Sequence, residues 1–210
     1  MGRITDAIKH LIIVNVIFFV AGIAGYGGIL YKYLALWFPE NQNFGIWQLV
    51  SHMFLHDFSG FLHILFNMYA LWAFGSPLER IWGRNKFLFF YFSAGIGAAL
   101  VHTAANYYFF TQGFTEVVNI PAVGASGAVY GVLVAFAFMY PNAQLMMIFL
   151  PIPIKAKYFV PLIIVGDLFF GFSNANTGIA HFAHIGGALI GFIMMWYWKR
   201  NQFNQNRWDS

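Results

Sequence analysis

Six long apolar runs, separated by short polar segments, restrict what this chain can fold into more than any other feature. They cover residues 8–30, 61–78, 87–105, 122–140, 158–172 and 178–198. An α-helix needs about 20 apolar residues to cross the ~30 Å hydrocarbon core of a bilayer. The runs therefore predict an all-α, polytopic membrane protein, with six transmembrane helices in a single domain over residues 1–210. The run at 158–172 is short, and we expect it to be tilted or shielded by its neighbours.

The scarcity of charge argues against a water-soluble fold of this size. Only 9% of the 210 residues are charged and 60% are hydrophobic, whereas soluble domains carry about 25% charged residues. Lipid is therefore predicted to cover most of the surface. The formal net charge of +4 is small for a nucleic-acid-binding protein, so no nucleic-acid partner is expected. The absence of cysteine excludes disulfides and thiol chemistry.

Lysine and arginine are distributed unevenly between the runs. With six crossings both chain ends lie on one side of the membrane, and that side holds ten of the eleven basic residues, all except Lys32. Basic residues accumulate on the cytoplasmic side, so both termini are expected there, including a polar tail at 201–210. The short tails favour a bacterial inner membrane. Although Arg3 and Lys9 suggest a signal peptide, the first run exceeds the roughly 7–15 apolar residues of such a region, so a retained anchor is expected.

The first loop on the outer side, at 31–60, is long, aromatic and amphipathic in its second half, so it is expected to lie in the membrane interface. His52 and His56 in this loop, and His181 and His184 in the last run, have spacings compatible with metal ligands. The sequence contains neither HExxH nor cysteine. We therefore predict no metal and no other cofactor, and we interpret the loop histidines as hydrogen-bonding residues and His181 as a helix-packing residue.

Small residues recur at four-residue spacing in two runs. Gly127 and Gly131 in the fourth run, and Gly187 and Gly191 in the sixth, each form a GxxxG pattern. Glycine lets helices approach closely, so we predict close backbone contact between these two helices. Tight packing alone would account for this pattern, which by itself indicates no function.

Polar side chains inside a membrane are costly and tend to mark functional sites. His63 and Asn67 lie in the second run, Ser126 in the fourth and His184 in the sixth. These three runs cross the membrane in the same direction, and at 1.5 Å per residue the four residues lie roughly 6–12 Å below the outer ends of their runs. The sequence therefore predicts that three helices bring a hydroxyl, imidazoles and an amide to one level in the outer half of the bilayer.

These groups are sufficient for acyl transfer. A serine hydroxyl becomes a nucleophile when a neighbouring base, usually histidine, takes its proton, and the oxyanion that forms needs donors. Ser126 lies at the start of a predicted helix, where free N–H groups favour negative charge, and Gly124 and Gly127 allow a substrate backbone to approach. His63 and Asn67 share a helix face and can both donate to one oxyanion. Taken singly, each residue has a structural explanation, such as a serine bonded to its own helix, but one site explains all of them.

Three strings that contain these residues resemble hallmark motifs of the rhomboid proteases. They are Gly124-Ala125-Ser126-Gly127, Ala183-His184-Ile185-Gly186-Gly187 and His63-Ile64-Leu65-Phe66-Asn67, in the usual order and on the expected runs. The resemblance covers about residues 47–198, and six spans match the minimal bacterial form of the family. It implies a serine endopeptidase that cleaves single-span membrane proteins within or near the outer half of the bilayer.

Carried over by motif, the family implies a Ser–His dyad without a catalytic carboxylate, with Ser126 as nucleophile and His184 as general base and acid. His63, Asn67 and the Ser126 backbone N–H would form the oxyanion hole. Tyr130 matches a tyrosine that packs against the catalytic imidazole. The site would be supported by the small residues Gly124, Gly127 and Gly187, and the fifth run and the short outer loops would act as gate and cap.

Other positions relate to the family less directly. Glu79 and Arg80 match a structural acidic–basic pair after the second span. Gln48 departs from the family, because many members have arginine at this position of the first outer loop, and the departure concerns the anchoring of the loop rather than the dyad. Asp167 in the fifth run has three possible roles: it could orient His184, mark a proton path or satisfy a helix end. Because the family dyad needs no acid, we interpret Asp167 as structural.

Two other classes of function compete with a protease. A catalytically inactive rhomboid-like protein would bind and retain membrane clients, but such proteins usually lose the serine or the histidine, and this chain keeps both Ser126 and His184. A transporter or channel would need several charges inside the membrane. Asp167 alone gives that interpretation little support.

Overall fold

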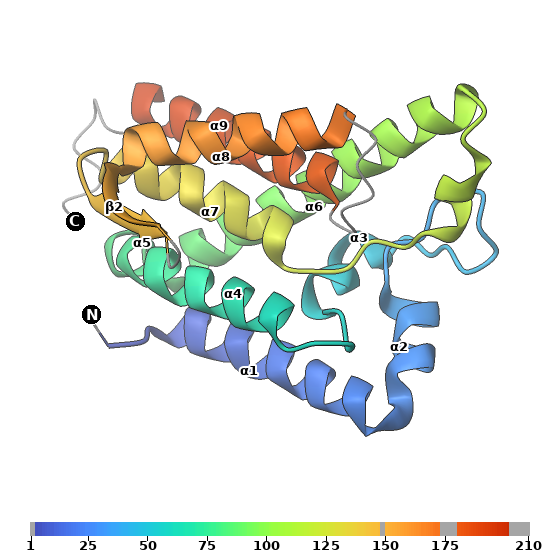
Figure 1. The fold of residues 1–210 in the computed structure, drawn as a ribbon. Coiled ribbons are helices and arrows are strands. Elements are labelled where there is room, and N and C mark those ends of the chain that lie inside the picture. Colours follow the sequence, from blue (N-terminus) through green and yellow to red (C-terminus); the bar gives the residue numbers. More distant parts are fainter. Residues whose placement is uncertain (1–2, 148–149, 173–179, 202–210) are drawn as a thin grey trace.

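The computed structural model describes residues 3–147, 150–172 and 180–201. Helices make up most of these residues, and each predicted apolar run lies on at least one of them (Figure 1). Residues 178–179 of the sixth run, and all of the predicted tail at 201–210 except Asn201, lie outside the described residues.

The first apolar run is bent. Helix α1 (Asp6–Ala21) continues through the π-helical turn η1 (Gly22–Tyr26) into α2 (Gly27–Leu34), which turns sharply away from α1 (Figure 1). Gly25 has a φ of 107°, a conformation that interrupts a right-handed helix and that glycine adopts without strain. Phe58 of the outer loop packs into the bend, where a Cβ on Gly22 would lie 2.1 Å from its ring. The run predicted at 8–30 is therefore not one straight helix.

The other helices alternate in direction. They are α3 (Gln48–Ser51), η2 (His52–Phe54), α4 (Leu62–Ala70), η3 (Leu71–Gly75), α5 (Ser76–Trp82), α6 (Arg84–Thr111), η4 (Thr115–Asn119), α7 (Ser126–Met139), α8 (Ala156–Phe172) and α9 (His181–Asn201). Helices α1, α6 and α8 run one way, whereas α4, α7 and α9 run the other way (Figure 1). The second, fourth and sixth apolar runs thus share one direction, as the sequence predicts.

A β-hairpin between α7 and α8 corrects the all-α prediction. Strand β1 (Gln144–Met147) pairs antiparallel with β2 (Leu150–Lys155), with Gln144 opposite Lys155 and Leu145 opposite Ile154. The sequence of β2 is LPIPIK, and its two prolines cannot continue a helix because they lack the N–H donor. A two-stranded ribbon has free edges that accept proline, so the connection forms a hairpin instead.

Glycines bring α7 and α9 into direct backbone contact, as their spacing predicts. A Cβ on Gly187 would lie 1.8 Å from the carbonyl oxygen of Gly127, and a Cβ on Gly191 would lie 2.7 Å from the Cα of Gly131. Helix α6 packs against the same glycines of α7, where a Cβ on Gly131 would lie 2.6 Å from the Cβ of Ala94. These contacts fix α7 against α9 at the level of Ser126 and His184.

Glu79 ties the start of α1 to α5. Its buried carboxylate, 6% exposed, accepts hydrogen bonds from the backbone N–H groups of Ala7 at 2.8 Å and Ile8 at 3.1 Å, and from the Thr5 hydroxyl. A negative charge at a helix N-terminus also interacts favourably with the helix dipole. Arg80 donates to the Arg3 carbonyl. Glu79 and Arg80, predicted to form a structural pair, therefore each hold the N-terminal segment by separate hydrogen bonds.

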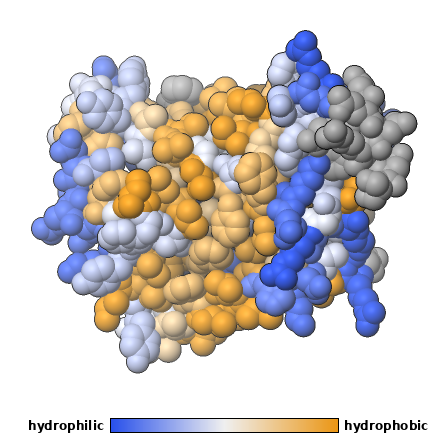
Figure 2. Space-filling model, turned by 180° about the vertical axis from the view of Figure 1, so that it is seen from behind, coloured by the Kyte–Doolittle hydropathy of each residue, from blue (hydrophilic) through white to orange (hydrophobic). Residues whose placement is uncertain are grey.

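The surface is apolar across its middle. Figure 2 shows a broad hydrophobic band with hydrophilic residues at both ends of the molecule. Ile17 on α1, Phe89 on α6 and Val165 on α8 are 60%, 63% and 61% exposed, and wide exposed apolar surfaces mark contacts with membranes or other proteins. By length and composition, two helical stretches of the described residues, Asp6–Leu34 and Arg84–Thr111, suffice to cross a membrane.

Candidate active site

Ser126 and His184 are in direct contact. Ser126 is the first residue of α7, and its hydroxyl oxygen lies 2.8 Å from Nε2 of His184, which is in the first turn of α9. His184 is 9% exposed. Gly127 and Gly187 hold the two helix ends together beside this pair. Two residues that are 58 positions apart in sequence therefore meet at the hydrogen-bonding distance that a nucleophile and its base require.

Tyr130 fixes the plane of the His184 ring. The two rings are stacked with their centroids 4.2 Å apart and an interplanar angle of 12°. Tyr130 lies one turn after Ser126 on α7, so one helix supplies both the hydroxyl and the surface on which the imidazole rests. The packing that the family resemblance implies for Tyr130 is thus present in this geometry.

Asp167 contacts the other nitrogen of the His184 ring, the one that does not face Ser126. Nδ1 of His184 is 3.2 Å from Oδ1 of Asp167 on α8, and Nδ1 of His181 is 2.5 Å from the same oxygen. All three side chains are buried. His181 therefore bonds to a carboxylate in addition to any packing role. The interpretation of Asp167 as merely structural missed that it contacts the dyad histidine, because sequence spacing does not reveal which face of α8 meets α9.

His63 presents one ring nitrogen to the serine. Its Nδ1 accepts a hydrogen bond from the backbone N–H of Asp57 at 3.3 Å, so in the neutral ring the proton is on Nε2. A Cβ on Gly124 would lie 3.0 Å from this Nε2 and 3.4 Å from the Ser126 hydroxyl oxygen. Both groups therefore lie against Gly124, whose φ of 127° suits glycine. A larger residue at position 124 would fill the space between them.

Asn67 uses one of its two amide N–H groups within its own helix. It lies one turn after His63 on α4 and is buried, but its amide nitrogen donates to the His63 backbone carbonyl at 2.9 Å. One N–H of the amide is occupied by this bond, and the second N–H remains available. The structure therefore places His63 and Ser126 beside the same glycine, Gly124, whereas one N–H of Asn67 bonds within α4.

The outer loop is anchored without the arginine that many family members carry. Gln48 is completely buried and donates to the Asn43 carbonyl at 2.8 Å, while its side-chain oxygen accepts from the Trp37 backbone N–H at 3.2 Å. Arginine has no acceptor, so the amide makes a bond that arginine cannot. The backbone carbonyl of Gln48 in turn accepts from Nδ1 of His52, 2.8 Å away. The His52 carbonyl accepts from the N–H of Gly124, so the chain of bonds ends beside Ser126.

The loop histidines are neutral. Burial lowers the pKa of His52 to about 4 and that of His56 to about 3, where the neighbouring His63 adds to the effect. His52 stabilises the loop by a hydrogen bond, as predicted. The same prediction is wrong for His56, because neither of its ring nitrogens has a hydrogen-bond partner in the described part of the chain. Its ring instead packs edge-on against His63, with centroids 5.0 Å apart.

Asp167, His181 and His184 also have the composition of a metal site. One ligand atom from each lies within 4.8 Å of the others. However, both imidazoles contact one carboxylate oxygen at 2.5 and 3.2 Å, which is the spacing of hydrogen bonds, and the other nitrogen of His184 is engaged by Ser126. The geometry fits a hydrogen-bonded cluster, and a metal ion would replace both of these bonds.

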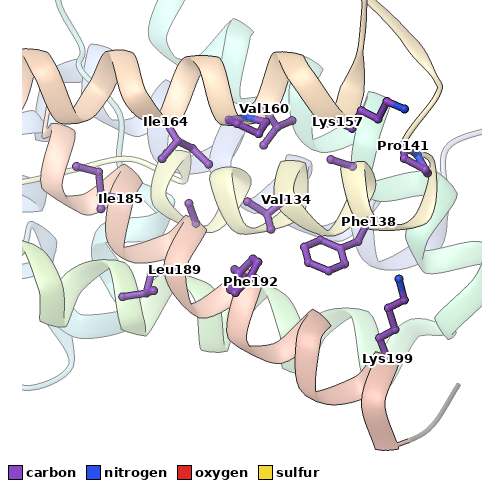
Figure 3. A pocket seen from close by; sticks show the side chains of 13 residues that line it. Val134, Phe138, Pro141, Lys157, Val160, Ile164, Ile185, Leu189, Phe192 and Lys199 are labelled. Atoms are coloured by element: carbon purple, nitrogen blue, oxygen red, sulfur yellow. The ribbon is translucent and has the colours of Figure 1, made fainter. Parts of the chain in front are cut away.

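One hollow on the described part of the molecule lies away from these groups. It has a volume of about 580 Å³ between α7, α8 and α9, and its walls are apolar side chains such as Val134, Ile164 and Phe192 (Figure 3). Lys157 and Lys199 lie at one end of it (Figure 3). Its lining residues do not include Ser126, His184, Asp167 or His63, so this groove contributes no group to the chemistry.

Known proteins resemble this chain in sequence. The family model described as "Rhomboid domain" matches residues 43–201. Rhomboid protease GluP of Bacillus subtilis is 33% identical over 147 residues, which are 70% of this chain and 25% of the relative. The human presenilin-associated rhomboid-like protein, mitochondrial, is 36% identical over 152 residues, 71% of this chain and 37% of the relative. Rhomboid protein 1, mitochondrial, of Saccharomyces cerevisiae is 29% identical over 153 residues, 71% of this chain and 41% of the relative.

The relatives bear on location and on family. This chain spans from a quarter to about two fifths of their lengths. Because both bacterial and mitochondrial proteins are among them, they do not favour the bacterial inner membrane that the short tails predict. The rhomboid model covers well over half of the chain, and the chain belongs to the rhomboid family of membrane-embedded proteins.

Proposed function

We propose that this chain is an intramembrane serine endopeptidase in which Ser126 is the nucleophile and His184 is the general base and acid. The observation that carries the proposal is the 2.8 Å contact between the Ser126 hydroxyl and Nε2 of His184, at the start of α7. A serine that served only its helix would bond to its own backbone. Here its hydroxyl contacts an imidazole on another helix.

The first step forms an acyl-enzyme. As the Ser126 oxygen bonds to the scissile carbonyl carbon, its O–H bond breaks and Nε2 of His184 takes the proton. The carbonyl oxygen acquires a negative charge beside the N-terminal turn of α7, whose first N–H groups have no acceptor within the helix. His63 directs its Nε2–H to the same place from α4. The Ser126 backbone N–H and the His63 side chain thus act as donors to the oxyanion, and the second N–H of Asn67 adds to them.

The acyl-enzyme forms when the carbon–nitrogen bond of this tetrahedral intermediate breaks and His184 gives its proton to the leaving amine. The second step regenerates the serine. Water from the outer side then loses a proton to Nε2 of His184 and attacks the acyl carbon, and the same proton returns to the Ser126 oxygen as the new carboxyl end leaves. In each step a single proton moves to and from Nε2 of His184, so the proposed mechanism uses no cofactor.

The proposal places this chemistry in the outer half of a bilayer crossed by six spans. Helices α1, α6 and α8 begin, and α5 and α9 end, at one end of the molecule (Figure 1). That end carries Arg80, Arg84, Lys157 and Arg200 at helix ends, which supports a cytoplasmic side. Ser126 and His184 lie near the N-terminal ends of α7 and α9, which are at the other end of the molecule. Substrates are single-span membrane proteins whose helix enters laterally and partly unwinds to present its carbonyl.

Cleavage in liposomes tests this function. Wild-type protein and Ser126→Ala are reconstituted separately with a single-span membrane protein that has small residues near the outer end of its span. We expect cleavage at one site in or near the outer half of the span by wild type and none by Ser126→Ala. Normal turnover in Ser126→Ala would contradict the mechanism. Well-folded wild type that retains the substrate without cleaving it would support the client-binding rival.

The absence of native cysteine permits a clean test of topology. Gln112→Cys at the end of α6 and Lys199→Cys in α9 each introduce a single thiol, and an impermeant maleimide is applied to sealed membranes. We expect Gln112→Cys to be labelled from the outer side and Lys199→Cys only from the cytoplasmic side. Labelling of both thiols from one side would contradict the alternating arrangement.

A further inference from the structure

The structure assigns Asp167 as a positioning residue that completes a Ser–His–Asp arrangement, in addition to the proposed dyad on which this inference rests. The three groups form two successive contacts. Oδ1 of Asp167 is 3.2 Å from Nδ1 of His184, and Nε2 of His184 is 2.8 Å from the hydroxyl of Ser126. The carboxylate and the serine therefore contact opposite nitrogens of one imidazole.

The carboxylate decides which nitrogen of His184 carries the proton. An ionised carboxylate only accepts hydrogen bonds, and a neutral imidazole has one donor and one acceptor nitrogen. Because Asp167 faces Nδ1, the proton is held on Nδ1, and Nε2 is left as an acceptor. Nε2 is the atom that must accept the proton from Ser126. Without the carboxylate, the ring is free to adopt the tautomer in which Nε2 is a donor and the base is lost.

Burial makes this control strong. Asp167 is 8% exposed and is the single acidic residue within the six apolar runs. A carboxylate in such surroundings is costly unless it is fully hydrogen-bonded, and electrostatic contacts there are weakly screened. Asp167 receives hydrogen bonds from His181 and His184. The buried carboxylate therefore depends on the proton on Nδ1 of His184, and this dependence favours that tautomer of the ring.

His181 supplies the matched control. It lies three residues before His184 on α9 and bonds to the same Oδ1 at 2.5 Å, whereas the Ser126 hydroxyl donates to His184. If Asp167 served only to fasten α8 to α9, removal of its bond to His181 would resemble removal of the carboxylate. If Asp167 positions His184, only the loss of the carboxylate has a large effect on serine reactivity.

The experiment compares wild type, Asp167→Asn and His181→Gln in full-length, detergent-solubilised protein. The rate of labelling by a fluorescent fluorophosphonate and the kcat and KM for a cleavable substrate are measured. We expect Asp167→Asn to lower the labelling rate and kcat by about 10²–10⁴-fold, since an aspartate-to-asparagine change in a soluble triad costs up to about 10⁴ by imposing the wrong tautomer. KM should change little, and His181→Gln should stay within a few-fold of wild type. Equal rates in wild type and Asp167→Asn would overturn the assignment.

Nitrogen-15 NMR of histidine-labelled protein reads the tautomer directly, with the His184 signals assigned by their loss in His184→Gln. In wild type we expect the proton on Nδ1, and in Asp167→Asn we expect it on Nε2. A wild-type proton on Nε2 would overturn the assignment even if Asp167→Asn fails to fold. Because this readout needs no turnover, it also separates the two proposals: wild type that fails to label contradicts the protease, whereas its tautomer still tests Asp167.

A chelator distinguishes hydrogen bonds from a metal. We expect labelling of wild type to be unchanged by EDTA and to be unaffected by prior dialysis against it. Loss of labelling on chelation, with recovery on addition of Zn²⁺, would mean that Asp167, His181 and His184 hold a metal ion, and the positioning role would be wrong.

Discussion

Among the residues that the structure describes, two carboxylates are buried, and they have different kinds of partner. Glu79, at the cytoplasmic end in our proposal, accepts hydrogen bonds from two backbone N–H groups and a hydroxyl. Asp167, near the opposite end, accepts from two imidazoles. Both side chains are less than a tenth exposed, so both need their partners. Backbone donors keep their protons, whereas an imidazole can exchange its proton between two nitrogens.

The contrast shows how the partners of a buried carboxylate separate structure from chemistry. Glu79 stabilises one fixed arrangement of the chain start, and nothing it contacts can change protonation during a reaction. Asp167 holds a ring whose second nitrogen touches a serine hydroxyl. We therefore expect changes near Glu79 to lower stability with little effect on reactivity, and changes around Ser126 to lower reactivity with little effect on stability.

Among residues other than Ser126, His184 and Asp167, His63 is expected to give the largest loss of kcat when it is changed to alanine. This change removes the Nε2–H that lies against Gly124, and loss of one oxyanion donor lowers kcat by about 10²–10³-fold. Asn67→Ala should lower kcat less, because the Asn67 amide already donates to the His63 carbonyl. The measurement is kcat for substrate cleavage, normalised to the folded fraction. An equal or larger loss in Asn67→Ala would reverse the order of the two donors.

On the other side of the comparison, Glu79→Ala should reduce the free energy of unfolding by about 2–3 kcal/mol, because it leaves buried donors without an acceptor. The labelling rate of the folded fraction should match wild type. Glu116→Ala is the matched control, since Glu116 is exposed in η4 and such surface changes stay within about 0.5 kcal/mol. Detergent thermal unfolding measures both. A Glu79→Ala protein of full stability but low reactivity would break the distinction.

Gly187→Ala should affect both properties, because the contact it disrupts holds both ends of the dyad. The added Cβ would lie 1.8 Å from the Gly127 carbonyl oxygen, so α7 and α9 must separate, at a cost of about 1–3 kcal/mol. Gly166→Ala on α8 is the control, since its Cβ would meet nothing within 4 Å. Unfolding midpoint and labelling rate are read together. A Gly187→Ala protein that matches Gly166→Ala in both would show that the close approach is unnecessary.

Asp57, an exposed carboxylate, should show the smallest effect. Hydrogen bonds from the Ser59 backbone N–H and hydroxyl, at 2.9 and 2.8 Å, lower the pKa of Asp57 below its ordinary 3.8. A lowered pKa contributes stability above the ordinary value and loses it as the pH falls through the folded-state pKa. The difference in unfolding midpoint between wild type and Asp57→Asn should therefore be small near pH 7 and vanish in acid. A difference that grows on acidification would contradict this sign.

The fold and the dyad were accessible from the sequence for identifiable reasons. Long apolar runs predict helices, four-residue glycine spacing predicts the α7–α9 contact, and the motif strings place Ser126 and His184 on those two helices. The bend at Gly25 and the hairpin before α8 were missed, because a run of apolar residues does not reveal a positive φ or a short ribbon. A closer reading of the alternating prolines in LPIPIK would have argued against a helix there.

The errors in the site concern direction rather than identity. The sequence identified Asp167 as a buried acid, but only packing shows that its α8 face meets His184. Likewise, the sequence does not reveal that one amide N–H of Asn67 bonds to the preceding turn of its helix. Gln48 raised a question about the loop that its three hydrogen bonds answer. Periodicity places residues on a face, whereas rotamers and partners depend on tertiary contacts.

The most direct test of the central claim is the reaction of the purified protein with a fluorescent fluorophosphonate, beside Ser126→Ala and with equal folding checked by thermal unfolding. An activated serine predicts labelling of wild type and its complete loss in Ser126→Ala, with the unfolding midpoint unchanged. Labelling that persists in Ser126→Ala, or its absence from folded wild type in both detergent and liposomes, would contradict the assignment of Ser126 and His184 as a catalytic pair.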